Sequence, residues 1–227
     1  EDQYYGPMPD VIAAQGSVVS VLMLNQCRAR ASDLSPISGT TTVHRIICAP
    51  YLRPWTEGLN FLCLCIAGIK VVALAARHNS GMVSRLSLFF GLTNASARSL
   101  VGARIHIQME EIIRHLNPKT VIFTYEGHPW ERLLCQFVHE ENPEINVIGY
   151  QHSVLLNGPA AVLQKFSKSL MPDRILTTGS ATARRFANSK SIDADSIIIV
   201  GSNKAQQAEA DFTRNAEKTI LVVPEGT

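Results

Sequence analysis

The residues best suited to chemistry lie together near the middle of the chain, where residues 124–131 read Thr-Tyr-Glu-Gly-His-Pro-Trp-Glu. Glu126 directly follows an apolar run, a suitable position for a general base that removes a proton from a hydroxyl. Pro129 suits the first position of a helix, which places His128 near the N-cap. There the free backbone N–H groups and the helix dipole favour an anion and keep the imidazole neutral. Gly127 permits a sharp reversal between the two elements, and we predict Glu126 and His128 to be catalytic.

The same segment also has a purely structural interpretation. Glu131 stands three residues after His128, the spacing of a capping box, in which the acidic side chain accepts from the N-cap backbone. Trp130 can serve packing alone. We expect Glu131 to cap the helix, and we expect Glu126 and His128 to carry function.

A second group of polar residues follows the next apolar run, where residues 149–153 read Gly-Tyr-Gln-His-Ser. Gln151 and His152 are suited to binding a sugar hydroxyl or a phosphate, while a histidine that only bridges two loops is the structural alternative. Ser153, His152 and Glu126 together would have the composition of a hydrolytic triad. The G-x-S-x-G elbow of such enzymes is absent.

Two short glycine turns complete the candidate site. Gly179 with Ser180, and Gly201 with the serine after it, follow two later apolar runs, although tight turns explain these positions equally well. The predicted substrate-contacting residues lie at the turns and strand ends and are Gly127, Gln151, His152, Ser153, Gly179, Ser180 and Gly201. No metal site and no cofactor are predicted, and neither a dinucleotide-binding fingerprint nor a P-loop is found in the sequence.

The elements that must position these residues alternate along the chain. Most of the strand-like runs are apolar throughout, which is typical of parallel strands covered on both faces. Alternating strands and helices predict a doubly wound, mostly parallel, Rossmann-like sheet, with ligands beyond the carboxyl ends of its strands. The predicted strands are 17–24, 42–48, 120–125, 145–150, 174–178, 196–200 and 219–223. The predicted helices are 59–76, 97–116, 129–140, 159–170 and 181–189.

Composition limits the class of protein. The chain has 227 residues, which is long enough to bury a sizeable core. Of these residues 46% are apolar and only 18% are charged, a composition that argues against disorder. Its formal charge of +2 argues against a nucleic-acid binder. The five cysteines lie mostly in apolar runs, Cys63 and Cys65 among them, and we interpret them as buried small side chains rather than a disulfide or zinc framework. A cytoplasmic location follows from that usage.

The most apolar segment is 59–76. Asn60 and Lys70 interrupt it, and no apolar run reaches 18 residues, so it predicts a buried or membrane-leaning helix rather than a span. Basic residues interleaved with Leu86, Leu88, Phe89 and Phe90 suggest a face that meets an anionic acceptor, or anionic lipid at the inner side of the cell membrane. An ordinary solvated face over a core helix is the alternative. The basic residues are Arg77, His78, Arg85, Arg98, Arg104, His106 and Arg114.

The end of the chain changes character. Residues 202–218 are polar and predict an interdomain linker, and 219–223 form a fresh apolar strand. We therefore expect a Rossmann-like domain over 1–201, a linker over 202–218, and the start of a truncated second domain over 219–227. On this interpretation the isolated piece is inactive.

Read in order, five segments carry a resemblance. They are VIFTYEGHPWERLL, VIGYQHS, PDRILTTGSATARRF, SIIIVGSNK and KTILVVPEGT. Together they resemble the N-terminal domain of GT-B-fold glycosyltransferases, and most closely those of bacterial surface-carbohydrate (capsule or O-antigen) biosynthesis. The resemblance covers roughly residues 118–227 and is most specific in TYEGHPWE; the first hundred residues match only in general architecture.

The resemblance implies an enzyme that transfers a sugar from a nucleotide-sugar donor to a hydroxyl of a polysaccharide or lipid-linked glycan acceptor. A C-terminal domain would hold the donor mainly, and this domain the acceptor. Glu126 would be the base, with His128, Gln151 and His152 lining the cleft. Two rival interpretations stay open: a nucleotide-sugar 2-epimerase, which needs no acceptor, and a non-catalytic carbohydrate-binding or scaffold domain.

Overall fold

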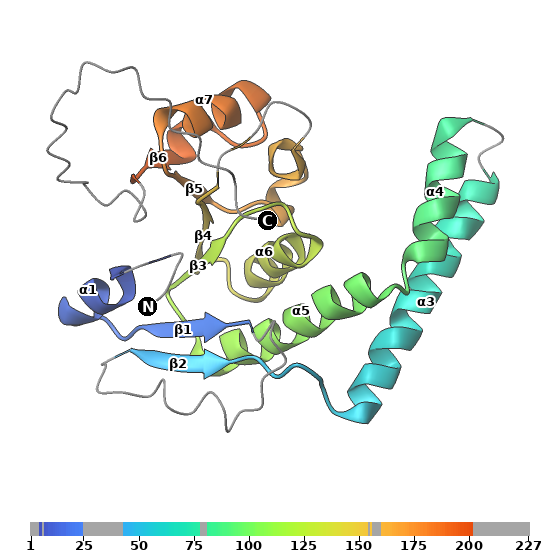
Figure 1. Ribbon diagram of the computed structural model, residues 1–227, viewed down its shortest axis with the longest axis horizontal. Coiled ribbons are helices and arrows are strands. Elements are labelled where there is room, and N and C mark those ends of the chain that lie inside the picture. The colour runs from blue at the N-terminus through green and yellow to red at the C-terminus, as the bar shows by residue number, and fades with distance from the viewer. Residues whose placement is uncertain are drawn as a thin grey trace, which may run out of the picture.

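The computed structural model describes residues 5, 7–24, 43–77, 81–153, 155 and 160–201. Within these residues the chain is an α/β structure whose strands are all parallel, in one sheet of four strands and one of two. The predicted linker at 202–218 and the predicted strand at 219–223 lie outside the described residues, as does Cys27. Figure 1 shows the arrangement.

The larger sheet carries the polar strand ends identified in the sequence. Its strands follow one another in chain order, so each connection steps to the next position across the sheet. Thr124 pairs with Tyr150 and Gln151 with Thr177, which brings the carboxyl ends of these strands to one edge. All four strands lie within one or two residues of their predicted bounds. They are β3 (Thr120–Thr124), β4 (Asn146–Gln151), β5 (Arg174–Thr177) and β6 (Ile197–Ile199).

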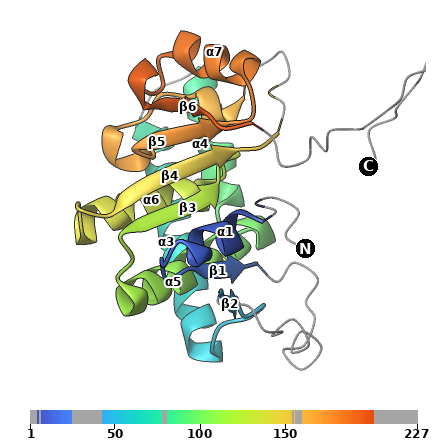
Figure 2. The same cartoon turned by 90° about the vertical axis from the view of Figure 1, so that its left-hand side faces the viewer.

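The smaller sheet pairs β1 (Ser20–Met23) with β2 (His44–Ile47), and both strands were predicted. Figure 2 shows this pair beyond β3, with β1 nearer to β3 than β2 is. No hydrogen-bonded ladder joins β1 to β3 within the described part of the chain. In space the strands lie in the order β2, β1, β3, β4, β5, β6. The chain therefore adds β2 on one side of β1 and all later strands on the other side, and this reversal of strand order is typical of a Rossmann-like sheet.

Six α-helices accompany these strands in the described residues. They are α1 (Met8–Ala14), α3 (Pro54–Arg77), α4 (Met82–Thr93), α5 (Ala97–Leu116), α6 (Pro129–Glu141) and α7 (Ser180–Ser189). The helices predicted around 59–76, 97–116, 129–140 and 181–189 are all present. The helices α1 and α4 were not predicted.

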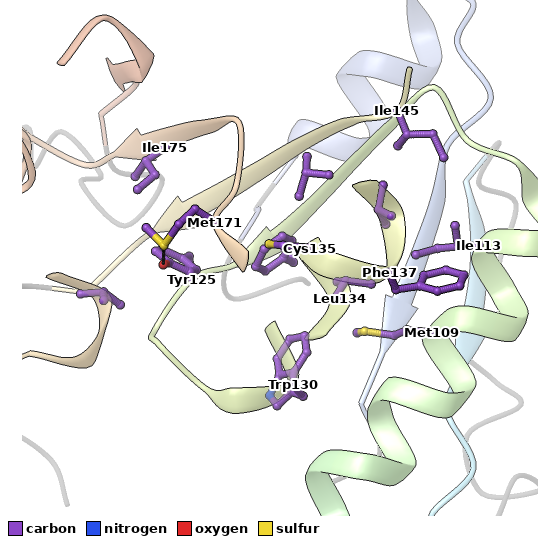
Figure 3. Packing of buried hydrophobic residues seen from close by; sticks show 14 of the residues in the cluster. Met109, Ile113, Tyr125, Trp130, Leu134, Cys135, Phe137, Ile145, Met171 and Ile175 are labelled. Carbon is purple, nitrogen blue, oxygen red and sulfur yellow. Dashed lines mark hydrogen bonds between the residues drawn. The ribbon is translucent and has the colours of Figure 1, made fainter. Parts of the chain in front are cut away.

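The main core lies between the larger sheet, α6 and α5. Figure 3 shows Leu134 and Phe137 of α6 directed toward Met109 and Ile113 of α5. Toward the sheet, the same cluster includes Ile175 of β5, which is fully buried. Burying a side chain of this size stabilises the fold by roughly 1.5–3 kcal/mol, so α6 is firmly held at the edge where the strands end.

The helix predicted at 159–170 is wrong. Residues 160–170 form two separate 3₁₀ turns, η2 (Ala161–Leu163) and η3 (Lys168–Leu170). Tertiary contacts hold these turns apart: the Arg132 guanidinium donates to the Ala161 carbonyl at 2.6 Å and stacks over the Phe166 ring at 3.8 Å. The apolar spacing that suggested a helix instead serves packing against α6.

The antiparallel hairpin of α3 and α4 stands apart from the sheets, connected to them through α5 (Figure 1). By length and composition α3 is apolar enough to cross a membrane, but it buries only Asn60, Gly68 and Ala75. The buried core helix considered from the sequence is therefore wrong. Cys63 is exposed and Cys65 half-buried, which corrects their assignment as buried side chains, while Cys48 and Cys135 are buried as predicted.

Candidate functional site

Glu126 lies between two histidines at the carboxyl edge of the larger sheet. Its Oε2 is 3.2 Å from His128 Nε2, and its Oε1 is 3.2 Å from His152 Nε2. Glu126 and His128 follow β3, whereas His152 follows β4. Because β3 and β4 are neighbouring parallel strands, Glu126 and His152, which are 26 positions apart, meet at one edge. The two residues predicted to be catalytic are thus joined by one of the predicted substrate-contacting residues.

Exposure differs within this trio. The side chains of Glu126 and His128 are 40% and 42% exposed, while that of His152 is 10% exposed. His128 Nε2 is hydrogen-bonded to Glu126 Oε2, whereas His152 Nε2 makes an ion-pair contact with Oε1. Because a carboxylate has about four lone-pair sites, these two contacts leave part of its accepting capacity unused. An accessible carboxylate with free accepting capacity is what abstraction of a proton from a hydroxyl requires.

Gly127 makes the reversal possible, as predicted. Its φ is +87°, in the region that side chains disfavour, and a Cβ there would lie 2.7 Å from both the Ala161 Cβ and the Val162 nitrogen. The turn therefore fits closely beneath η2, and both the conformation and the space demand glycine. This contact fixes where the Glu126 and His128 backbone sits.

Glu131 holds the same turn from inside. Its carboxylate is fully buried and accepts from the backbone N–H groups of Glu126 at 3.1 Å, Gly127 at 2.7 Å and His128 at 3.0 Å. The predicted capping role of Glu131 is confirmed. Burial raises the pKa of Glu131 to about 7, against the opposing effect of these N–H donors.

This capping corrects one expectation about the helix N-terminus. Free backbone N–H groups were expected near the N-cap, His128, where they would favour a bound anion. The His128 N–H, together with those of Glu126 and Gly127, instead donates to the Glu131 side chain. A negatively charged ligand would therefore need other donors at this edge.

Arg132 is a supporting residue that the sequence analysis missed. It is 8% exposed, donates from Nη2 to the Ala161 carbonyl, and lies 3.5 Å from the Tyr125 hydroxyl through Nη1. Tyr125 is fully buried, and burial raises the pKa of its hydroxyl to about 12. The sequence did hold a signal for Arg132, because it lies between the apolar residues 130 and 134 of the same helix. A charged residue on a buried helix face is almost never fully buried unless it is paired.

Gln151 and Ser153 form a pair beside the trio. Gln151 is 1% exposed, and its Nε2 donates to the Ser153 hydroxyl at 2.8 Å and to the Ser153 carbonyl at 3.2 Å. Its Oε1 is buried and has no hydrogen-bond partner among the described residues. The Ser153 hydroxyl is thus bound by an amide, which gives no support to a hydrolytic triad, although the acid–histidine half of one is present.

Gly179, Ser180 and Gly201 lie at the same edge of the sheet but farther along it. Gly179 is the N-cap of α7 and Ser180 is exposed, with no side chain capping this helix. Gly201 follows β6 with a φ of +83°. Since β5 and β6 are two and three strands from β3, these residues lie roughly 10 and 14 Å across the sheet. The described contacts do not join them to Glu126.

Two other features bear on where a ligand would bind. Within the described residues, no group of three or more His, Cys, Asp or Glu side chains is arranged to hold a metal ion. A cavity of about 360 Å³ lies at the opposite end of the sheet, before β3 and β4 begin, and is therefore separate from the trio. Its lining residues are Ile113, Arg114, Asn117, Glu141, Asn142 and Ile145.

No protein-family model, curated protein or solved structure matches this chain.

Proposed function

We propose that this chain is the acceptor-binding part of a GT-B-type glycosyltransferase, which transfers a sugar from a nucleotide-sugar to a hydroxyl of a surface polysaccharide or lipid-linked glycan. One observation carries the proposal. Glu126 is an accessible carboxylate at the carboxyl edge of a parallel sheet, with each oxygen held by an imidazole from a different strand end.

In this reaction Glu126 accepts the proton of the acceptor hydroxyl while that oxygen attacks the anomeric carbon of the donor sugar. The bond from the anomeric carbon to the phosphate oxygen breaks, and the nucleotide leaves with its electron pair. His128 and His152 orient the carboxylate through their Nε2–H groups. Because the carboxylate keeps unused lone pairs, it binds the hydroxyl without losing either histidine.

The leaving phosphate needs N–H or cationic donors. The turn at residues 126–128 has none to spare, because Glu131 occupies them. The N-terminus of α7, at Gly179 and Ser180, lacks a side-chain cap and is the remaining donor set that this proposal assigns to the phosphate. Because α7 follows β5, and β4 alone lies between β5 and β3, a nucleotide-sugar has to extend roughly 10 Å across the sheet.

The reversal of strand order between β1 and β3 supports the doubly wound architecture of such a domain. The donor, the acceptor and a donor-binding domain are parts of this proposal.

The test compares Glu126→Gln with Glu144→Gln, a control that removes an exposed carboxylate from the turn before β4. The protein expressed from its complete reading frame is incubated with UDP-, GDP-, dTDP- and CMP-sugars, with and without a bacterial glycolipid extract. Nucleotide release and sugar incorporation are both measured. We expect acceptor-dependent release that Glu126→Gln reduces about 100-fold or more while Glu144→Gln leaves it unchanged.

Three results would contradict the proposal. Unchanged turnover in Glu126→Gln would remove Glu126 as the base. Interconversion of nucleotide-sugars without acceptor would identify an epimerase. Glycan binding by a protein that shows no turnover with any donor would identify a binding or scaffold domain.

A further inference from the structure

The α3–α4 hairpin exposes apolar side chains and buries small or polar ones, the opposite of what is expected for a helix pair in water. Every residue that it buries is small or polar: Asn60, Gly68 and Ala75 on α3, and Gly91 on α4. Leu64, Val71 and Val72 are half-buried, and Val72 packs against Gly91, but most of the large apolar side chains face outward. Those on the two helices that are at least 40% exposed are Trp55, Leu59, Phe61, Leu62, Ile66, Ile69, Leu74, Met82, Val83, Leu86, Leu88, Phe89, Phe90 and Leu92.

The two helices meet through small residues and hydrogen bonds. A Cβ on Gly68 would lie 2.5 Å from the Gly91 carbonyl oxygen, so the backbones touch there. The Ser84 hydroxyl donates to the Ala75 carbonyl at 2.9 Å, and the Asn94 amide donates to the Leu64 carbonyl at 2.7 Å. Small residues and polar cross-links at the contact, with large apolar residues outside, are typical of helices that pack in lipid.

The exposed apolar surface of the hairpin is broader than the single apolar stripe with which a helix usually contacts a partner protein. On α3, Trp55, Leu62 and Ile69 repeat every seven residues, and Leu74 lies about a third of a turn from that line at 100° per residue. On α4, the outward positions are Met, Val, Leu, Phe and Arg on all sides except the contact with α3. A protein partner usually covers one stripe, whereas lipid surrounds an apolar hairpin from many directions.

The fold does not allow α3 to span a bilayer. The segments that flank the hairpin are bound to each other: Ala49, before α3, exchanges hydrogen bonds of 2.7 and 3.1 Å with Gln108 of α5. Glu57 at the start of α3 also pairs with Arg104 of α5 at 2.6 Å. Both ends of the hairpin are therefore on one side, and α4, with 12 residues, extends only about 18 Å. It cannot recross a hydrocarbon core of about 30 Å.

Charge on the hairpin favours an anionic surface. Between residues 54 and 93 the only acid is Glu57, which is paired at the base, while Lys70, Arg77 and Arg85 are cations. Part of the basic face predicted from the sequence is wrong, because several of its members make ion pairs within the protein. These are Arg104 with Glu57, His106 with Glu110, and Arg114 with Glu110 and Glu141.

We propose that the α3–α4 hairpin is a monotopic membrane anchor that lies in the interfacial region of an anionic bilayer. Its outward apolar side chains enter the acyl region from one side, and Lys70, Arg77 and Arg85 extend their charged ends to the lipid phosphates. The sheets and the Glu126 trio stay in water beside the membrane. This inference does not depend on the transferase proposal, because it concerns a different surface.

Flotation with lipid vesicles tests the anchor. The protein is mixed with phosphatidylcholine vesicles, with or without 30% phosphatidylglycerol. We expect wild-type protein to float with the anionic vesicles and to float less with the neutral ones. Phe89→Ser with Phe90→Ser should reduce flotation about tenfold or more, and Lys70→Glu with Arg85→Glu should abolish the preference for anionic lipid. The matched charge control is Lys119→Glu with Arg174→Glu, which should float like wild type. Both residues are exposed, Lys119 directly before β3 and Arg174 as the first residue of β5.

Tryptophan fluorescence provides a second readout on the unaltered fold. The chain has two tryptophans, of which Trp55 is 78% exposed and Trp130 is 9% exposed. We expect anionic vesicles to shift the emission to the blue and brominated lipid to quench it, with both effects absent in Trp55→Phe.

Failure of wild type to float, or equal flotation by all variants, would overturn the anchor. The anchor would also be overturned if the wild-type protein bound no vesicles and formed a dimer that became a monomer in Phe89→Ser with Phe90→Ser. That result would identify the hairpin as an interface between two copies. Circular dichroism of each variant shows whether it keeps its helices.

Discussion

Helices α6 and α3 show that apolar composition and burial are separate properties. The shorter helix, α6, buries seven of its 13 residues, including the charged Glu131 and Arg132. The longer and more apolar α3 buries three of 24. The difference arises from position: α6 lies between the sheet and α5, while α3 contacts little besides α4 and part of α5. The protein thus separates a rigid polar site on a buried helix from an apolar surface on an exposed one.

The largest expected effect of this difference is on core packing. Leu134→Ala in α6 should lower the free energy of unfolding by about 2–5 kcal/mol, because Leu134 is 1% exposed and truncation leaves a cavity. Leu62→Ala in α3 is the matched change at a side chain that is 53% exposed, and it should cost less than about 0.5 kcal/mol. Urea unfolding without lipid measures both, and similar losses would mean that α3 is buried against a partner in solution.

A smaller effect is expected from two glycines. Gly127→Ala should destabilise the protein by about 2 kcal/mol or more, since φ is +87° and the added Cβ meets η2. Gly58→Ala in α3 meets nothing within 4 Å and should stabilise by up to about 1 kcal/mol through helix propensity. Thermal unfolding compares the two variants. A harmless Gly127→Ala would show that the turn is looser than these contacts indicate.

A third expected effect is confined to a pH range and concerns Glu131. Burial raises its pKa from 4.5 to about 7 in the folded state, so the folded protein holds a proton that the unfolded chain releases. The contribution of Glu131 to the free energy of unfolding is therefore complete below pH 4.5 and is lost as the pH rises to about 7. Glu131→Gln should therefore flatten the stability profile between these values, by about 3 kcal/mol at most.

Urea unfolding across that pH range measures the profile. Glu140→Gln, at an exposed position near the end of the same helix, should leave the wild-type slope in place. A variant Glu131→Gln that keeps the full slope would show that another group causes it.

Much of the site was predictable because it depends on local chemistry. The proline and acid after His128 predict the capped start of α6, and Glu131 caps it as expected. Glu126 and His128 are two residues apart, so their contact at 3.2 Å needs only the turn at Gly127. Arg132 was missed because its partners, Ala161 and Phe166, are about 30 residues away and come from turns that were predicted as a helix.

The sequence by itself determined where the strands β1 to β6 and the helices α5, α6 and α7 lie, because apolar runs and turn residues act over a few positions. Only the tertiary structure decided that His152 meets Glu126, since that contact depends on β3 and β4 being neighbours. It also decided that α3 is exposed. A helix that is apolar on all sides has the same sequence pattern whether it is surrounded by protein or by lipid, and only the contacts around it distinguish the two.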